Sequence, residues 1–451
     1  MQPVCLPQIE GRSDAAASTL TMIKVTLASS LGTYIDFYDL FIAGFVAADV
    51  WPTLFFPHGS PIIGLAESVA TYFLAFFVRP IGALIYGHLG DTRGRQGTLV
   101  WTLVTAGVGM VGIALTPSYA TIGLAAPALI ILFRLLFGLG LGGEWGGAMA
   151  LVAEYGAKSK WRPFWMGWIQ GGAGGGRAFA GLAFVAVASM LSRDAFLSYG
   201  WRILFLIGGS ILVIAVVMRY RLAESPLFVA LQRRKAVEKS PAIQVLKRYW
   251  RRILLLGGAI TFDQCVPSVL LLPFSVAYLV ALANSRHVIG ITAGLISLAV
   301  SVASLGDVFF QVIGGVFGSI KGRRTGLLMA ALVCLIAVGG YFPLVNTLDV
   351  TNIFLAMFLA MVGVGLANGC LGAFLNEYFE TKYRYTGAGL SYQVSTLITA
   401  VSAGIIFPII LVNAGSVITQ WPYALGLTVA LILISMTCLA CAKETQGVAL
   451  D

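Results

Sequence analysis

The stretch GHLGDTRGRQG, at residues 87–97, decides the fold because a similar stretch, GVFGSIKGRRTG, follows at residues 315–326. Three glycines and one arginine recur at a constant offset (315 − 87 = 228), about half of the 451-residue chain. The recurring residues are Gly87, Gly90, Gly94 and Arg95, which match Gly315, Gly318, Gly322 and Arg323. One offset held at four positions indicates a duplicated chain, and a short polar loop repeated in two hydrophobic halves is typical of pseudo-symmetric transporters.

The composition predicts a protein that crosses a membrane many times. Apolar residues make up 58% of the chain and charged residues only 11%, which is far outside the range of soluble domains. A membrane-spanning helix needs about 20 mostly apolar residues. Twelve such runs lie near residues 23–50, 62–87, 97–117, 124–154, 163–191, 201–221, 252–283, 288–317, 325–344, 351–378, 387–415 and 421–441. We therefore expect an all-α polytopic fold with twelve transmembrane helices in two pseudo-symmetric six-helix bundles.

The polar segments divide the chain into five parts. We expect a cytoplasmic N-terminal segment (1–22), a first bundle (23–221), a cytoplasmic central loop (222–251), a second bundle (252–441) and a cytoplasmic tail (442–451). Residues 1–21 lack the pattern of a secretory signal. In the central loop, Ser225 followed by Pro226 is a favourable start for an amphipathic helix at the membrane surface.

The positions of the basic residues predict the orientation in the plasma membrane. Only six of the 29 Lys and Arg residues fall outside the segments assigned to the cytoplasm, as the positive-inside rule requires. These six are Arg193, Arg202 and Arg286 in outer loops, and Arg79, Arg134 and Arg177 within spans. The net charge of +10 therefore reflects topology and contact with anionic lipid headgroups, and does not indicate nucleic-acid binding.

Several motifs resemble those of the major facilitator superfamily. GHLGDTRGRQ resembles the signature loop between its second and third helices, and RLLFGLGLGGEWGG, from Arg134, resembles its fourth-helix signature. The metabolite:proton symporter branch is indicated by IDFYDLFIAG (35–44), FFVRPIGALIYGHLGD (76–91), GGEWGGA (142–148), AESPLF (223–228) and YRYTGAGLSYQ (383–393). Members of that branch move citrate, 2-oxoglutarate, shikimate, or proline and betaine. The resemblance implies a monomeric carrier without cofactors that imports a small polar metabolite, an organic acid or a compatible solute, by proton symport and alternating access.

The repeated loop is the candidate gate. Its glycines allow close helix approach, and Asp91 can pair with Arg95 one turn later and favour the dipole of the following helix. The resemblance implies that this loop braces the cytoplasmic side against the other half of the chain. The gating residues are Gly87, Gly90, Asp91, Gly94, Arg95 and Arg323. A purely topogenic role, in which basic residues keep the loop inside, is the alternative.

Ionisable residues within spans are the candidates for proton coupling, because burying a charge in a bilayer costs at least about 2.5–3.5 kcal/mol. Asp36 and Asp39 are three residues apart and share one helix face, and Arg134 falls at the depth of Asp39. We expect Asp39 to carry the proton with Arg134 as its partner, and Asp36 or Glu144 to serve as an auxiliary carboxylate. A permanent structural ion pair is the alternative.

The remaining polar residues within spans are candidates for substrate binding. Arg177 near the midplane favours an organic anion, although pairing with an acid for folding is equally compatible with its position. Other candidates are Tyr38, Gln170, Asp263, Gln264 and Gln393. Arg79 and Asp307 occupy equivalent positions of the repeat (307 − 79 = 228), which predicts a charged structural pair near the inner gate.

Other classes of function fit the sequence less well. The three histidines, His58, His88 and His287, lie near span ends, and no metal-ligand or nucleophile–base spacing occurs, so we expect neither an enzyme nor a metal site. GGAGGG (171–176) lacks the Lys and Ser/Thr of a phosphate loop. A proton-independent facilitator, or an antiporter or exporter of small metabolites, remains the alternative function.

Overall fold

The computed structural model describes residues 18–57, 61–406, 417–448 and 450, and the regular structure within these ranges is entirely helical. In the first half of the chain the long helices are α1 (Thr19–Asp49), α3 (Pro61–Arg93), α4 (Arg95–Leu115), α6 (Ala125–Tyr155), α7 (Arg162–Met190) and α9 (Trp201–Tyr220). In the second half they are α11 (Pro241–Ala259), α14 (Ala293–Lys321), α15 (Arg323–Val345), α16 (Val350–Glu377), α17 (Arg384–Val401) and α19 (Trp421–Cys441).

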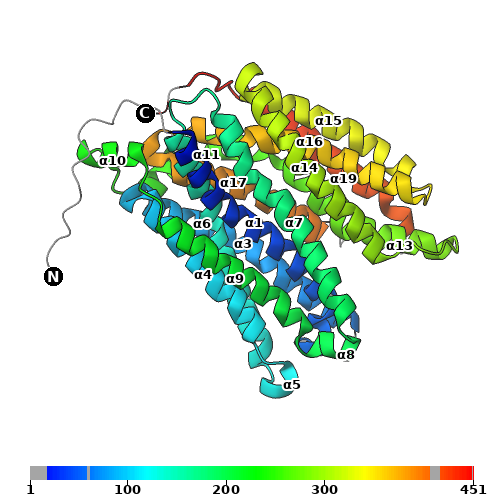
Figure 1. Ribbon diagram of the computed structural model, residues 1–451. Helices are drawn as coiled ribbons and strands as arrows, with labels where there is room; N and C mark the ends of the chain where they lie inside the picture. The colour runs from blue at the N-terminus through cyan, green and yellow to red at the C-terminus, as the bar shows by residue number, and fades with distance from the viewer. Residues whose placement is uncertain (1–17, 58–60, 407–416, 449, 451) are drawn as a thin grey trace.

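Shorter elements complete the described structure. They are α2 (Trp51–Leu54), α5 (Tyr119–Ile122), α8 (Arg193–Ala195), the π-helix η1 (Phe196–Gly200), α10 (Pro226–Arg233), α12 (Thr261–Cys265), the π-helix η2 (Val266–Phe274), α13 (Ser275–Ser285), and the short helices η3 (Thr381–Tyr383), η4 (Ser402–Ile406) and η5 (Val417–Gln420). In Figure 1 the long helices run side by side, with α10 at one end of the bundle and α5 and α8 at the other. We call the end that carries α10 the basic end.

The apolar runs of the sequence became helices, with two departures from the expected boundaries. Nine helices of the described residues are long and apolar enough to cross a membrane. The expected run 252–283 is divided among α11, α12, η2 and α13, and its π-helical part contains Pro267. Part of the expected run 387–415 lies outside the described residues. Helix α1, which carries the three aspartates Asp36, Asp39 and Asp49, is not among the nine. The total of twelve spans stays a prediction, as does the division into five parts, of which residues 1–17 are not described.

Close helix packing depends on glycine at a few crossings. A Cβ atom on Gly142 of α6 would lie 2.1 Å from the carbonyl oxygen of Arg79 on α3, and one on Gly314 of α14 would lie 2.2 Å from that of Leu366 on α16. Lipid gives helices no hydrophobic reason to associate, so backbones that approach this closely gain their stability from van der Waals contact. The two halves use glycine in the same way.

The repeated loops have the same construction in both halves. One glycine joins α3 to α4 and another joins α14 to α15, with φ of 122° at Gly94 and 106° at Gly322, a region that favours glycine. A carboxylate caps the helix that follows each loop. Glu224 accepts from the backbone N–H of Arg95 at 2.9 Å, and Glu444 accepts from that of Arg323 at 2.8 Å. The sequence repeat is therefore a structural repeat at the basic end.

The central segment begins its helix where the sequence predicts. The hydroxyl of Ser225 accepts a hydrogen bond from the N–H of Phe228 at 3.2 Å, which makes Ser225 the N-cap of α10. The helix ends at Arg233, and a second helix, α11, begins at Pro241.

Replacing Gly142 with alanine should destabilise the protein, because the added methyl group would overlap the Arg79 carbonyl. Overpacking of this kind costs about 1–3 kcal/mol. The matched control is Gly97→Ala in α4, where an added Cβ meets nothing within 4 Å. We expect a lower thermal unfolding midpoint in detergent for Gly142→Ala and an unchanged or slightly higher one for Gly97→Ala. Equal midpoints for the two variants would contradict the close α3–α6 contact.

Candidate functional site

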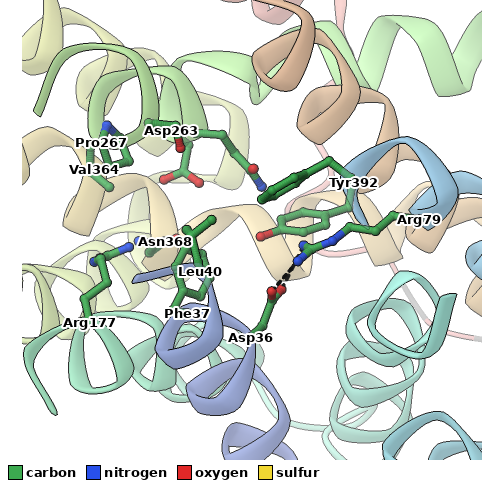
Figure 2. Close-up of a pocket in the computed structure, with 13 residues that line it drawn as sticks. Asp36, Phe37, Leu40, Arg79, Arg177, Asp263, Pro267, Val364, Asn368 and Tyr392 are labelled. Atoms are coloured by element: carbon green, nitrogen blue, oxygen red, sulfur yellow. Dashed lines mark hydrogen bonds and ion pairs between the residues drawn. The ribbon is translucent and has the colours of Figure 1, made fainter. Parts of the chain in front are cut away.

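A small cavity lies between helices of the two halves (Figure 2). Its volume is about 30 Å³, which has room for water but not for a metabolite of several heavy atoms. The first half contributes Asp36, Phe37, Leu40, Phe76, Arg79 and Arg177; the second half contributes Asp263, Gln264, Pro267, Ser268, Val364, Asn368 and Tyr392. Charged side chains thus meet ring and amide side chains at a junction between the halves.

The first charged pair of the cavity joins α1 to α3. Arg79 donates two hydrogen bonds to Asp36, with Nη1 to Oδ2 at 3.0 Å and Nη2 to Oδ1 at 2.5 Å (Figure 2). The guanidinium also lies over the ring of Phe76, 4.6 Å from its centroid. Both oxygens of Asp36 are therefore occupied, and the cation is neutralised where it borders the cavity.

The second pair, Asp39 and Arg134, has the juxtaposition that the sequence predicts. Nη1 of Arg134 lies 2.7 Å from Oδ2 of Asp39, and both side chains are buried. The other guanidinium nitrogen donates to the carbonyl of Tyr72 at 3.3 Å. Oδ1 of Asp39 is buried and has no hydrogen-bond partner in the described part of the chain. Asp39 is thus bound through one oxygen only, unlike Asp36.

The third pair crosses between the halves. Arg177 on α7 donates to Asp307 on α14, and its Nε donates to the hydroxyl of Ser304 at 3.2 Å. Asn368 on α16 donates to the other oxygen of Asp307 at 3.2 Å. The expectation that Arg79 and Asp307 form one structural pair near the inner gate is wrong, because each binds a different partner beside the cavity. Arg177 therefore gives no separate support for an organic anion, because Asp307 already neutralises its charge.

The structure separates the other substrate candidates into two groups. Asp263 and Gln264 line the cavity together with Arg177. Three candidates do not line it. Tyr38 donates to the carbonyl of Leu204 at 2.7 Å, and Gln170 binds Trp145 and Asn368. Gln393 donates through Nε2 to the carbonyl of Gly142 at 3.2 Å, while its buried Oε1 has no partner among the described residues. Glu144 binds Arg219 of α9, and it also does not line the cavity.

Two cross-half contacts on the basic side of the cavity escaped sequence reasoning. The rings of Trp145 on α6 and Tyr392 on α17 stack with centroids 4.0 Å apart and planes inclined by 7°. Gln170 on α7 accepts from the indole nitrogen of Trp145 at 2.8 Å and donates to Asn368 on α16 at 2.9 Å. Asn368 is the one amide in the middle of an apolar run, which is the signal that could have identified it. Together these side chains hold the two halves in contact.

The candidate gating residues lie at the basic end, where Asp91 joins the halves. Asp91 pairs with Arg95 at 3.1 Å, as predicted, and also accepts from the backbone N–H groups of Tyr385 and Thr386 at 3.2 and 2.9 Å. Those N–H groups belong to the first turn of α17, whose dipole favours a carboxylate. A Cβ on Gly90 would lie 2.1 Å from the ring of Tyr385, so glycine permits this contact.

Two buried carboxylates repeat one arrangement at the same end. Glu154 binds Arg95 of its own half at 3.1 Å and Arg384 of the other half at 3.1 Å. Glu377 binds Arg323 of its own half at 3.0 Å and Arg162 of the other half at 2.7 Å. Each carboxylate therefore holds one arginine from each half. The positive-inside effect alone does not account for these buried acids.

A match to a family model now adds to this geometry. The model described as Major Facilitator Superfamily matches residues 15–403. The chain belongs to the major facilitator superfamily. Its members are transporters and not enzymes, so this is a membrane transport protein.

Individual members of the superfamily match over most of their length. The chain is 35% identical to the inner membrane metabolite transport protein YhjE of Escherichia coli (strain K12) over 378 residues, which are 84% of this chain and 85% of YhjE. It is 29% identical to the proline/betaine transporter of the same organism over 388 residues, 84% of this chain and 76% of that one. A structure of the proton:xylose symporter XylE, bound to 6-bromo-6-deoxy-D-glucose, matches 96% of this chain and 98% of its own with a TM-score of 0.73 and 16% identity, which shows the fold.

Replacing Asp91 with asparagine should favour conformers that are open at the basic end. The change removes the negative charge at the first turn of α17, and loss of such an interaction should shift the conformational equilibrium by about tenfold. Spin labels at Lys160→Cys and Lys321→Cys, in a variant without the native cysteines, would report this shift as a larger population of long distances.

The control for this measurement is Glu380→Gln at the same end of the bundle. Glu380 pairs with Lys382 at the surface, at 3.0 Å, and the hydrogen bond from Lys382 lowers the pKa of Glu380 below its usual value. Exposed pairs of this kind contribute little. If Asp91→Asn and Glu380→Gln gave the same distance distribution as the parent, Asp91 would have no bracing role.

Proposed function

We propose that the protein imports a small polar metabolite, an organic acid or a compatible solute, by proton symport and alternating access. The observation that carries the proposal is the buried Asp39–Arg134 pair beside a charged cavity between the halves. We further propose that the protein works as a monomer in the plasma membrane, with its basic end and both termini in the cytoplasm, in accord with the positive-inside rule.

The singly bound state of Asp39 supports its role as the proton carrier. Its Oδ2 accepts from Arg134, whereas its Oδ1 has no partner in the described part of the chain and can take up a proton. A neutral Asp39 would release part of its hold on Arg134, which keeps the carbonyl of Tyr72 as a second acceptor. Nearby charge and solvation both control proton affinity, and both change when helices separate and water enters. Proton binding can therefore follow the conformation.

Asp36 and Glu144 are better suited to positioning than to proton transfer. Asp36 is held through both oxygens by Arg79, and Glu144 faces an arginine that also binds the carbonyls of Ala28 and Ser29. Neither side chain has an oxygen that, like Oδ1 of Asp39, is buried and without a partner among the described residues. The auxiliary role of these two carboxylates stays a hypothesis.

The contacts that close the basic side support alternating access. The Trp145–Tyr392 stack, the Gln170–Asn368 hydrogen bond and the Glu154 and Glu377 arrangements all cross between the halves. A substrate that leaves toward the basic end must pass them. We propose that these contacts separate together when the transporter faces the cytoplasm.

Replacing Asp39 with asparagine should abolish uphill uptake while sparing exchange. The variant keeps the side-chain volume but cannot bind and release a proton. An imposed proton gradient can therefore no longer drive substrate uptake. In proteoliposomes we expect the accumulation ratio of a transported substrate to fall to about one, while exchange of labelled for unlabelled substrate continues. The control is Asp49→Asn at the end of the same helix, where Asp49 forms an exposed pair with Arg193.

The same assay distinguishes the alternative functions. A proton-independent facilitator would equilibrate its substrate in the parent protein whether or not a gradient is present. Uphill uptake that survives in Asp39→Asn would remove Asp39 from its proposed role and leave Asp39–Arg134 as a permanent structural pair.

A further inference from the structure

The polar atoms that line the cavity are not all satisfied. Three of them are buried and have no hydrogen-bond partner in the part of the chain that the structure describes: Oδ1 of Asp263, Nε2 of Gln264 and Nε of Arg79. Leaving a buried polar atom without a partner costs about 1–3 kcal/mol. The cavity has room for water, which can bond these atoms, and a ligand that enters must replace those hydrogen bonds with its own groups.

The charges that face the cavity leave an excess carboxylate. Arg79 is neutralised by Asp36, and Arg177 is neutralised by Asp307. Asp263 is 5% exposed, and among the described residues no cationic group forms an ion pair with it. Figure 2 shows its carboxylate directed into the cavity, between Arg177 and Tyr392. A ligand that carries only negative charge would add to this excess, whereas a cationic nitrogen would neutralise it.

The unsatisfied atoms also specify hydrogen-bonding character. Asp263 lacks a donor, and the two nitrogens, on Gln264 and Arg79, lack an acceptor. An ammonium group with N–H bonds supplies the donor, and a carboxylate supplies the acceptors. A quaternary ammonium has no N–H bond to give Asp263. It usually binds over aromatic rings, but the rings of Phe37, Phe76 and Tyr392 each already have one face against a guanidinium or an indole.

We propose that the substrate is a small amino or imino acid, with its ammonium on Asp263 and its carboxylate on Gln264 and Arg79. The inference rests on the proposed function, because it takes this cavity as the transport site. The cavity is narrow, so it must widen when the substrate binds, and this favours the smaller members of the class. Asp263 is then the residue that selects amines over amine-free acids.

Equilibrium binding to the purified full-length protein in lipid nanodiscs tests this proposal without any gradient. The probes are the twenty standard amino acids, glycine betaine, citrate, shikimate and 2-oxoglutarate, followed by the amine-free analogue of the tightest amino acid. We expect at least one amino or imino acid to bind, and removal of its amine to weaken binding at least about tenfold, since a charge-assisted hydrogen bond is lost. Binding of only glycine betaine or amine-free acids, or of no amino acid at all, would overturn the proposal.

Variants of Asp263 locate the interaction. Asp263→Asn should weaken amino-acid binding by about 10- to 100-fold, because a charge-assisted hydrogen bond is lost, and Asp263→Glu should restore part of the affinity. The control is Asp194→Asn in α8, outside the cavity. Elution profiles and melting curves establish that each variant is folded. Parent-like amino-acid affinity in a folded Asp263→Asn would overturn the assignment.

Uptake into proteoliposomes separates this proposal from proton symport. An amino acid that binds through Asp263 but does not accumulate under an inward proton gradient would support the substrate class and contradict symport. Gradient-driven accumulation of an amine-free acid would support symport and overturn the substrate class.

Discussion

The constraint on which this structure depends is that an arginine buried among membrane-spanning helices needs a carboxylate. Arg79, Arg134, Arg177 and Arg219 each bind one, and each pair joins two helices: α1 with α3, α1 with α6, α7 with α14 and α6 with α9. Removing one partner of such a pair costs about 3–5 kcal/mol, because the other charge stays buried. The pairs therefore fix which helices are neighbours and how each is rotated. Asp263 has no such cation among the described residues, and the ammonium group of the substrate proposed above would supply one.

The repeat makes the contact between the halves reciprocal. Glu154 recruits Arg384 from the second half, and Glu377 recruits Arg162 from the first, while Arg95 and Arg323 hold the two acids in place. Separating the halves at the basic end breaks both arrangements, so neither carboxylate can keep both of its cations. The closed basic end is thereby favoured over partly open forms. The single-glycine turns at Gly94 and Gly322 make Arg95 and Arg323 the first residues of α4 and α15.

The sequence predicted the contacts that depend on spacing along one helix or on depth in the membrane. Asp91–Arg95 follows from helical periodicity, and Asp39–Arg134 follows from equal depth on neighbouring helices. Arg177–Asp307 and Gln170–Asn368 could not be predicted, because they depend on which helices of the two halves face each other. The contact of the Tyr38 hydroxyl with the carbonyl of Leu204 could not be predicted either, since a polar residue on a span does not reveal the rotation of its helix. The π-helix η2 lies within a run that reads as continuous apolar helix.

The proposed proton site and the cavity are adjacent but separate, and α1 connects them. Asp36 borders the cavity through Arg79, and Asp39, one turn further along the same helix, holds Arg134. The carboxylate of the proposed substrate, by accepting from Nε of Arg79, would compete with Asp36 for the same guanidinium. It would thereby weaken the Asp36–Arg79 pair that joins α1 to α3. Because α1 is continuous over this turn, a displacement of the helix at Asp36 would also move Asp39 relative to Arg134. Substrate and proton would thus both act on helix α1. Their binding can be coupled through this helix without direct contact between the two ligands.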